Sequence, residues 1–226
     1  MARIIFRWAL REAMGLVMMG VILFLSSSRL NWTMAWALII VMAAWIAATG
    51  MAVIPRYPQL LADRVSPPKG AKRWDTVIMG IAGGLTVAGY AIAGLDLRYG
   101  WTRGMPEVLP IAALVVTVTG YSIVVWATAS NAFFSMAVRI QTERGHTVAT
   151  GGPYRFVRHP AYIGMVFQFL AVPILLGSWW AALTGVACAL LILLRTMLED
   201  RTLREELAGY KEYTSRVRYR LMPGIW

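Results

Sequence analysis

Two ionisable side chains near the end of the last apolar stretch could carry chemistry together. Arg195 and Glu199 are four residues apart, so on a helix they share one face about one turn apart. Ionisable groups at membrane depth often mark a site lined by water or ligand. A guanidinium suits a substrate carboxylate or phosphate, whereas a carboxylate suits a cofactor amine, a hydroxyl or a proton. The alternative interpretation is a snorkelling arginine paired with a glutamate at the membrane interface.

A second polar cluster is the stretch TGGPYRFVRHPAYIG, residues 150–164, which lies between two apolar regions. The glycines and proline of residues 151–153 break any helix, and Pro160 can start the next one. Such a loop lets backbone approach a ligand closely, and the helix start offers free N–H groups to an anion. His146 and His159 are thirteen residues apart without a cysteine partner, so we predict no metal site.

The composition indicates where these groups lie. The chain has 226 residues, of which 58% are hydrophobic and 15% are charged, which is too apolar for an ordinary soluble domain. The apolar runs lack the alternation of barrel strands, so helices are expected. We predict an all-α integral membrane protein with about six transmembrane helices. The six runs cover roughly residues 13–28, 32–54, 74–95, 107–130, 161–177 and 178–198.

The net charge of +11 follows the predicted topology rather than indicating a nucleic-acid partner. Basic residues gather before the first run, between the second and third, between the fourth and fifth, and after the sixth. By the positive-inside rule, both termini and the loop at 138–160 are expected in the cytoplasm. Arg155 and Arg158 are interpreted as part of this pattern. The first run has no small-residue cleavage site and a second run follows at once, so we predict a retained helix.

The chain divides into two parts by the position of its polar residues. Residues 1–130 are predicted to form scaffold helices, whereas residues 131–226 hold the candidate site at one face of the bilayer. The last apolar helix is expected to continue out of the membrane and to end near Gly209. The single cysteine, Cys188, excludes a disulfide within the chain and is interpreted as a small core residue.

The motifs GHTVATGGPYRFVRHPAYIG and RTMLEDRTLREELAGYKEY, in that order, resemble the isoprenylcysteine carboxyl methyltransferase family. Its bacterial relatives among integral-membrane methyltransferases, including phospholipid N-methyltransferases, are similar too. The resemblance covers roughly residues 131–226. It implies an S-adenosyl-L-methionine pocket, enclosed by the last helices and the C-terminal segment, in an enzyme of the protein-S-isoprenylcysteine O-methyltransferase type. It also implies a multi-pass protein of the bacterial inner membrane and a lipophilic acceptor that enters from the bilayer.

The resemblance also implies roles for individual residues. Glu199 matches the cofactor-binding glutamate, Arg195 matches the arginine near the substrate, and Asp200 stands where many members have a second glutamate. Gln141 lies closer to the following histidine than is usual in the family, and Ala149 replaces a larger side chain. The cofactor-contacting positions carried over by motif are Gln141, His146, Thr147, Val148, Ala149, Tyr154, His159, Pro160, Ala161, Tyr162 and Glu199.

Methyl transfer from a sulfonium depends mainly on positioning and exclusion of water, so no metal and no covalent nucleophile is expected. Tyr154 or Tyr162 could face the sulfonium through a cation–π contact, or either could be an interfacial anchor. A carboxylate acceptor would need Arg195 to orient it and no base. An amine or thiol acceptor would need Glu199 or His159 to assist proton loss. The sequence leaves open a prenylated protein carboxylate, a phospholipid amine, and a small lipophilic acid or thiol.

Two other functions remain as alternatives. An NADPH-dependent membrane reductase of the sterol reductase type has a similar C-terminal architecture and ends in an element like YRLMP, residues 219–223. Such a reductase would be expected to have more spans and a longer nucleotide-binding region. A non-catalytic transport or scaffold protein would place polar groups near the bilayer midplane, often in symmetric halves, whereas here they lie at one surface and no repeat is found.

Overall fold

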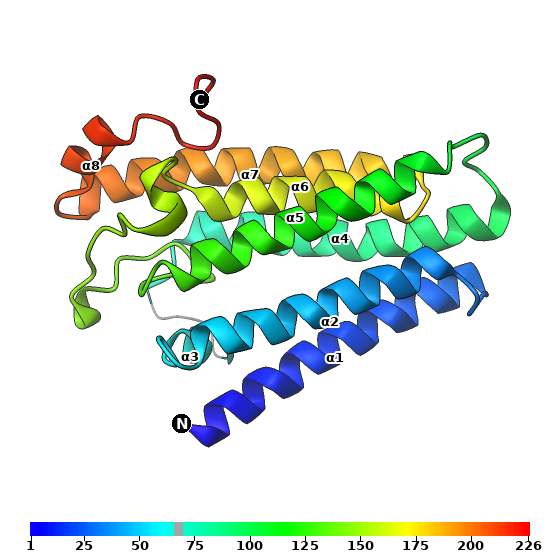
Figure 1. Ribbon diagram of the computed structural model, residues 1–226, viewed down its shortest axis with the longest axis horizontal. Coiled ribbons are helices and arrows are strands. Elements are labelled where there is room, and N and C mark those ends of the chain that lie inside the picture. Colours follow the sequence, from blue (N-terminus) through cyan, green and yellow to red (C-terminus); the bar gives the residue numbers. More distant parts are fainter. Residues whose placement is uncertain (66–69) are drawn as a thin grey trace.

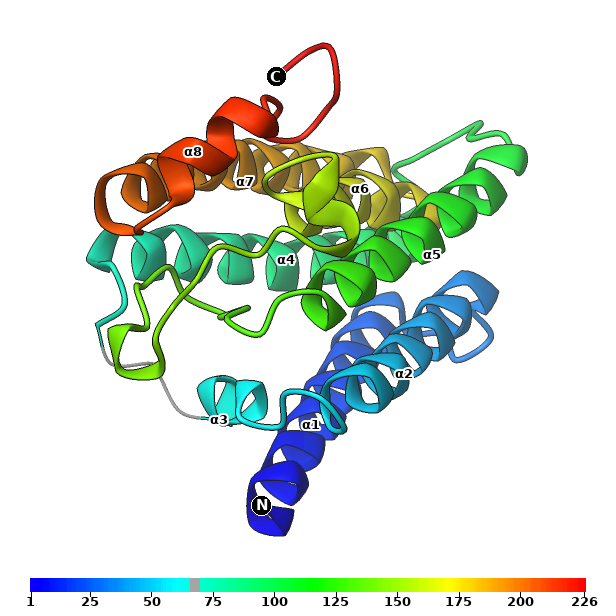
Figure 2. The ribbon, with the colours of Figure 1, turned by 60° about the vertical axis from the view of Figure 1, so that its left-hand side comes forward.

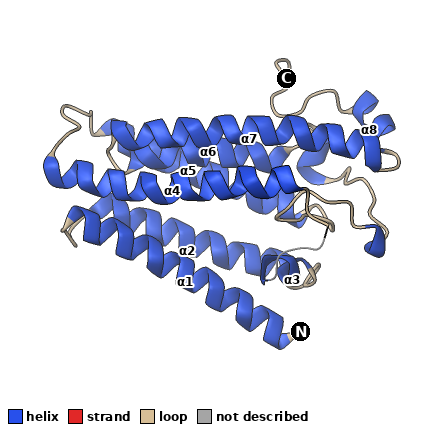
Figure 3. Ribbon diagram, turned by 180° about the vertical axis from the view of Figure 1, so that it is seen from behind, coloured by secondary structure: helices blue, strands red, loops and turns tan. Residues whose placement is uncertain are grey.

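The computed structural model describes residues 1–65 and 70–226, and every regular element in this part of the chain is a helix (Figure 3). This confirms the all-α prediction. In chain order the elements are α1 (Ala2–Ser27), α2 (Thr33–Val53), α3 (Leu60–Val65), α4 (Arg73–Tyr99), α5 (Val108–Ala129), the short 3₁₀ turns η1 (Thr142–Arg144) and η2 (Gly152–Arg155), α6 (Pro160–Leu175), α7 (Trp179–Glu206) and α8 (Tyr210–Arg216).

All six predicted apolar helices form. The helices α1, α2, α4, α5 and α7 are long and apolar enough to cross a membrane, which confirms an integral membrane protein. The helix α6 is shorter, with 16 residues, or about 24 Å at 1.5 Å per residue. A hydrocarbon core is about 30 Å thick, so α6 is shorter than the other five apolar helices relative to this thickness.

Helix boundaries near both ends of the chain differ from the sequence prediction. The helix α1 begins at Ala2 rather than near residue 13, so Arg3, Arg7 and Arg11 belong to it. Arginine is a good helix former, and its long side chain can reach water from a helix that enters the membrane. The helix α7 ends at Glu206 instead of Gly209. Gly209 adopts a left-handed conformation with φ of 78°, and the short helix α8 starts directly after it.

The four helices α4 to α7 lie side by side, and the hairpin of α1 and α2 diverges from them toward the N-terminus (Figures 1 and 2). The helices α4 and α6 both pack against α7, and α5 packs along α6. The contact of α5 with α6 is close because glycines face each other: a Cβ added at Gly120 would lie 2.8 Å from the carbonyl oxygen of Gly164. The short helix α6 is therefore held between two longer ones.

The segment after α7 folds back over the end of the bundle (Figure 2). Leu207, Tyr210, Tyr213 and Val217 form a hydrophobic cluster, and Val148 of the preceding loop packs against it. The loop between α5 and α6 and the C-terminal segment thus meet at the same end of the molecule, which is where the predicted site residues gather.

Candidate functional site

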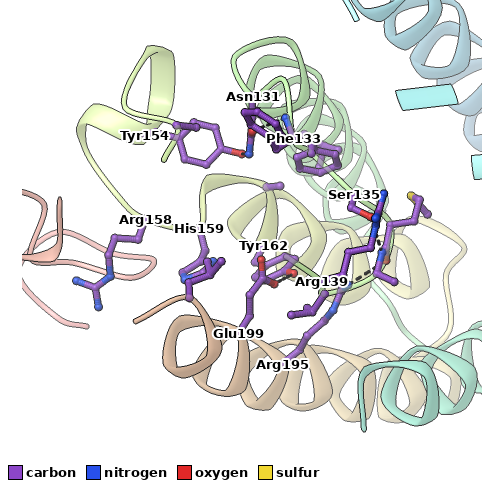
Figure 4. Close-up of a pocket in the computed structure, with 18 of the residues that line it drawn as sticks. Asn131, Phe133, Ser135, Arg139, Tyr154, Arg158, His159, Tyr162, Arg195 and Glu199 are labelled. Atoms are coloured by element: carbon purple, nitrogen blue, oxygen red, sulfur yellow. Dashed lines mark hydrogen bonds between the residues drawn. The ribbon is translucent and has the colours of Figure 1, made fainter. Parts of the chain in front are cut away.

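A cavity of about 270 Å³ opens at this end of the bundle, close to the lower limit of typical small-molecule sites, roughly 300–1,000 Å³. Most of the residues predicted from the sequence lie on its wall, and Figure 4 shows several of them around one space. Gln141 and Pro160 are not among the lining residues. The predicted residues that line the cavity are His146, Thr147, Val148, Ala149, Tyr154, His159, Ala161, Tyr162, Arg195 and Glu199.

Tyr162 of α6 connects three of the predicted residues. Its hydroxyl donates a hydrogen bond to the carboxylate of Glu199 on α7. Its ring stacks on the imidazole of His159, with centroids 5.6 Å apart and planes 1° from parallel. The guanidinium carbon of Arg195 lies 5.1 Å from the centre of the same ring. The motif residues of α6 and the pair on α7 therefore come together, and Tyr162 fixes the direction of the Glu199 carboxylate.

Arg195 has a partner that the sequence did not indicate. Its Nε lies 2.7 Å from Oδ1 of Asp75 on α4, and its Nη2 donates to the carbonyl of Met136 at 3.0 Å. Asp75 also accepts a hydrogen bond of 2.8 Å from the backbone N–H of Val138. Among the described residues Arg195 forms no ion pair with Glu199. The signal for this contact was an aspartate at the very start of an otherwise apolar run.

Asp200, the residue next to Glu199, faces away from the cavity and collects positive charge. It is 1% exposed. Arg158 binds both of its oxygens, at 2.7 and 3.2 Å. Arg220 donates from Nε at 3.0 Å, Arg204 forms an ion pair at 3.2 Å, and the hydroxyl of Tyr210 donates at 3.1 Å. This one carboxylate joins α7 to the entry of α6, to α8 and to the C-terminal tail.

The interpretation of Arg158 as a topology marker was wrong. Its side chain is buried, and its Nη1 donates to the carbonyls of Val217 and Arg218 at 2.9 and 2.6 Å, in addition to the Asp200 pair. The guanidinium group of arginine has five N–H donors, so it can donate hydrogen bonds to a carboxylate and to two carbonyls at the same time. Arg155, in contrast, is exposed.

His159 lies behind Tyr162 in the same network. Its Nε2 is 3.4 Å from both Oδ1 of Asp200 and the hydroxyl of Tyr210, and its backbone N–H donates to the carbonyl of Arg220 at 2.9 Å. Pro160 begins α6, as predicted from its position. The histidine is thus placed by the tail as much as by its own helix.

Gln141 organises the loop instead of lining the cavity. Its side chain is fully buried, donates to the carbonyl of Phe133 at 2.7 Å, and accepts a hydrogen bond from Arg144. Its backbone N–H donates to Nδ1 of His146 at 3.3 Å, and the His146 ring stacks on Phe133 with centroids 4.7 Å apart. Because Nδ1 accepts this hydrogen bond, the imidazole is neutral and carries its proton on Nε2.

Tyr154 lies on the far wall from α7 (Figure 4). Its hydroxyl accepts a hydrogen bond of 3.4 Å from Asn131, and its carbonyl accepts one of 2.7 Å from the hydroxyl of Tyr213. Burial raises the pKa of the Tyr154 phenol above its ordinary value, so the group stays protonated at neutral pH. Asn131 and Phe133 also line the cavity, and both were missed because they match no motif.

The N-terminal segment also reaches the cavity. Arg11 and Glu12 of α1, Trp45 of α2 and Arg64 of α3 are on its wall. Sequence reasoning treated residues 1–130 as scaffold because they share little with the family beyond apolar character. Nothing in local spacing could have shown that α1 and α3 extend along the site.

Neutralising Asp200 is expected to release the C-terminal segment. In Asp200→Asn, three arginines lose their carboxylate, and removing one partner of a buried pair costs on the order of 3 kcal/mol. We expect a lower unfolding temperature and faster proteolysis of the tail after Glu206. The control is Glu205→Gln, which removes an exposed pair with Arg201 and is worth about 0–1 kcal/mol. Equal behaviour of the two variants would contradict this role.

His146 is expected to make stability depend on pH. Burial lowers the pKa of His146, and the nearby Arg144 and Arg139 lower it further. Below about pH 6.5 the histidine of the unfolded chain therefore binds a proton more readily than that of the folded protein. The folded state consequently loses stability as the pH decreases. Between pH 8 and pH 5.5 the unfolding temperature of the native protein should drop more than that of His146→Asn. Parallel curves for the two proteins would refute the assignment.

Residues 111–205 match the model of the isoprenylcysteine carboxyl methyltransferase (ICMT) family, and no curated protein matches the chain. The matched segment runs from α5 to the end of α7 and so contains the loop, the Tyr162–Glu199 contact and Arg195. The activity that this family implies is methyl transfer at a membrane. The match covers somewhat less than half of the chain, and it agrees with the family resemblance that the motifs predicted.

Proposed function

We propose that this protein is an S-adenosyl-L-methionine-dependent methyltransferase that acts at the cytoplasmic membrane face on a lipophilic acceptor. The observation that carries the proposal is the meeting of Tyr162, His159 and Glu199 on the wall of one cavity at the end of a membrane bundle. The cytoplasmic location rests on the positive-inside distribution of arginine and lysine.

The residues on the wall fit the cofactor chemically. S-Adenosylmethionine supplies an activated methyl group on a sulfonium, together with an ammonium, a carboxylate and an adenosine. Among the described residues, Tyr162 is the one that hydrogen-bonds to the Glu199 carboxylate. An ionised carboxylate has about four acceptor positions, so Glu199 retains capacity for an ammonium or a ribose hydroxyl. We assign it this role.

The rings of two tyrosines would interact favourably with the positive charge of the cofactor sulfonium. Tyr154 and Tyr162 both line the cavity from different elements, and a cation over such a ring gains about 0.5 to 2 kcal/mol depending on desolvation. The loop at 146–149 would approach the cofactor mainly with backbone groups and small side chains, since Thr147 and Ala149 leave room. Gln141 and Pro160 would act indirectly, by shaping the loop and by starting α6.

Positioning would account for most of the rate. In-line displacement needs donor and acceptor held together with water excluded, and the C-terminal segment covers this end of the bundle (Figure 2). Arg195 lies one helical turn before Glu199, fixed by Asp75, and would orient the acceptor beside the methyl group. A carboxylate acceptor would need no base. For an amine or thiol, His159 or Glu199 would take the proton.

Binding measurements test this function. The purified protein in detergent is titrated by calorimetry with S-adenosylmethionine and, in parallel, with NADPH. We expect binding of the former alone, and at least about tenfold weaker binding in Glu199→Gln, because a charge-assisted hydrogen bond is lost. Glu205→Gln serves as the control for loss of an acidic residue on the same helix. A folded native protein that binds no S-adenosylmethionine would disprove the proposal.

A further inference from the structure

The positive charges around the cavity are mostly balanced by carboxylates of the protein. Arg158 pairs with Asp200, and Arg195 pairs with Asp75. Arg139 contacts Glu143 at 2.6 Å, and Arg11 is exposed to solvent. The arginines on the cavity wall are Arg11, Arg64, Arg139, Arg158 and Arg195.

Arg64 differs from the others. It is 7% exposed, yet no hydrogen bond or ion pair joins its side chain to any residue that the structure describes. Burial lowers the pKa of its guanidinium, and the carboxylate of Glu12 partly offsets this. Glu12 acts from beyond the 4.0 Å of an ion pair, so the charge of Arg64 is buried without a direct partner in the described part of the chain.

The position of Arg64 is fixed by its neighbours. The helix α3 packs against α1, where Leu60 and Leu61 are fully buried in a cluster with Trp8 and Val53. This apolar face anchors the short helix and leaves Arg64 on the cavity wall. Arginine is almost never buried unless paired, and a buried charge without a counterion is strongly destabilising. A site with such a group is suited to a ligand that brings the missing anion.

We propose that Arg64 binds the carboxylate of a ligand in this cavity. The inference rests on the proposed methyltransferase function, and it adds an anion-binding residue on α3 to the one proposed on α7, Arg195. Two nitrogens of Arg195 already bind Asp75, and one of these also binds the carbonyl of Met136. The planar fork of Arg64, in contrast, is available to a carboxylate. The carboxylate belongs either to the cofactor or to the methyl acceptor.

The experiment compares the native protein with Arg64→Gln, Arg64→Lys and the control Arg56→Gln, which removes an exposed charge from the same connection. Each full-length protein is purified in detergent, and its unfolding temperature is checked. Binding is then measured separately for S-adenosylmethionine, for dodecanoate and for dodecylamine. Transfer of a labelled methyl group to the last two probes is measured in the same preparations.

If the acceptor supplies the anion, Arg64→Gln weakens dodecanoate binding at least tenfold, leaves S-adenosylmethionine binding unchanged, and Arg64→Lys recovers part of the loss. If the cofactor supplies it, S-adenosylmethionine binding weakens instead by a similar factor. Changes below twofold for both carboxylates, or equal losses in Arg56→Gln, overturn the proposal. So does a native protein that binds neither carboxylate. If the native protein binds dodecanoate through Arg64 but does not bind S-adenosylmethionine, the methyltransferase proposal alone fails.

Discussion

The arrangement of this site depends on the buried carboxylate of Asp200. It is the point where α7, the entry of α6, α8 and the tail are joined, through Arg158, Arg220 and Tyr210. A buried carboxylate with several cationic partners is stable because the arginines more than neutralise its negative charge. Their N–H groups also donate hydrogen bonds to its oxygen lone pairs. Without it, Arg158 and Arg220 would lose their shared counterion, and the tail would be held to the start of α6 only by hydrogen bonds to its backbone carbonyls, such as the one from His159 to Arg220.

Adjacent residues of α7 divide two tasks. Successive side chains on a helix point about 100° apart, so Glu199 faces the cavity whereas Asp200 faces the tail. One turn earlier, Arg195 connects α7 to α4 through Asp75. The same helix therefore binds α4 through Arg195 and binds the C-terminal segment through Asp200. It also directs the carboxylate of Glu199 into the cavity. This explains why the chemically capable residues of α7 occur within six positions, 195–200, at the end of its apolar run.

The sequence predicted well what depends on local chemistry. The apolar runs gave the helices, Pro160 gave the start of α6, and the motif residues Tyr162 and Glu199 meet as the family resemblance implied. The sequence could not predict contacts between residues that are far apart along the chain. Asp75 lies 120 positions from Arg195, and no spacing rule connects them. Arg158 has the same charge as the topology markers around it, and only its burial distinguishes it.

Similarity to the ICMT family over residues 111–205 points to methyl transfer at a membrane, and the cavity at the end of the bundle is the site that we propose for it. The most direct measurement incubates membranes that contain the protein with S-adenosylmethionine labelled in its methyl group, then extracts the lipophilic fraction. The account predicts a labelled lipophilic product that is absent from membranes without the protein and strongly reduced with Glu199→Gln. Equal labelling in all three membranes would contradict it.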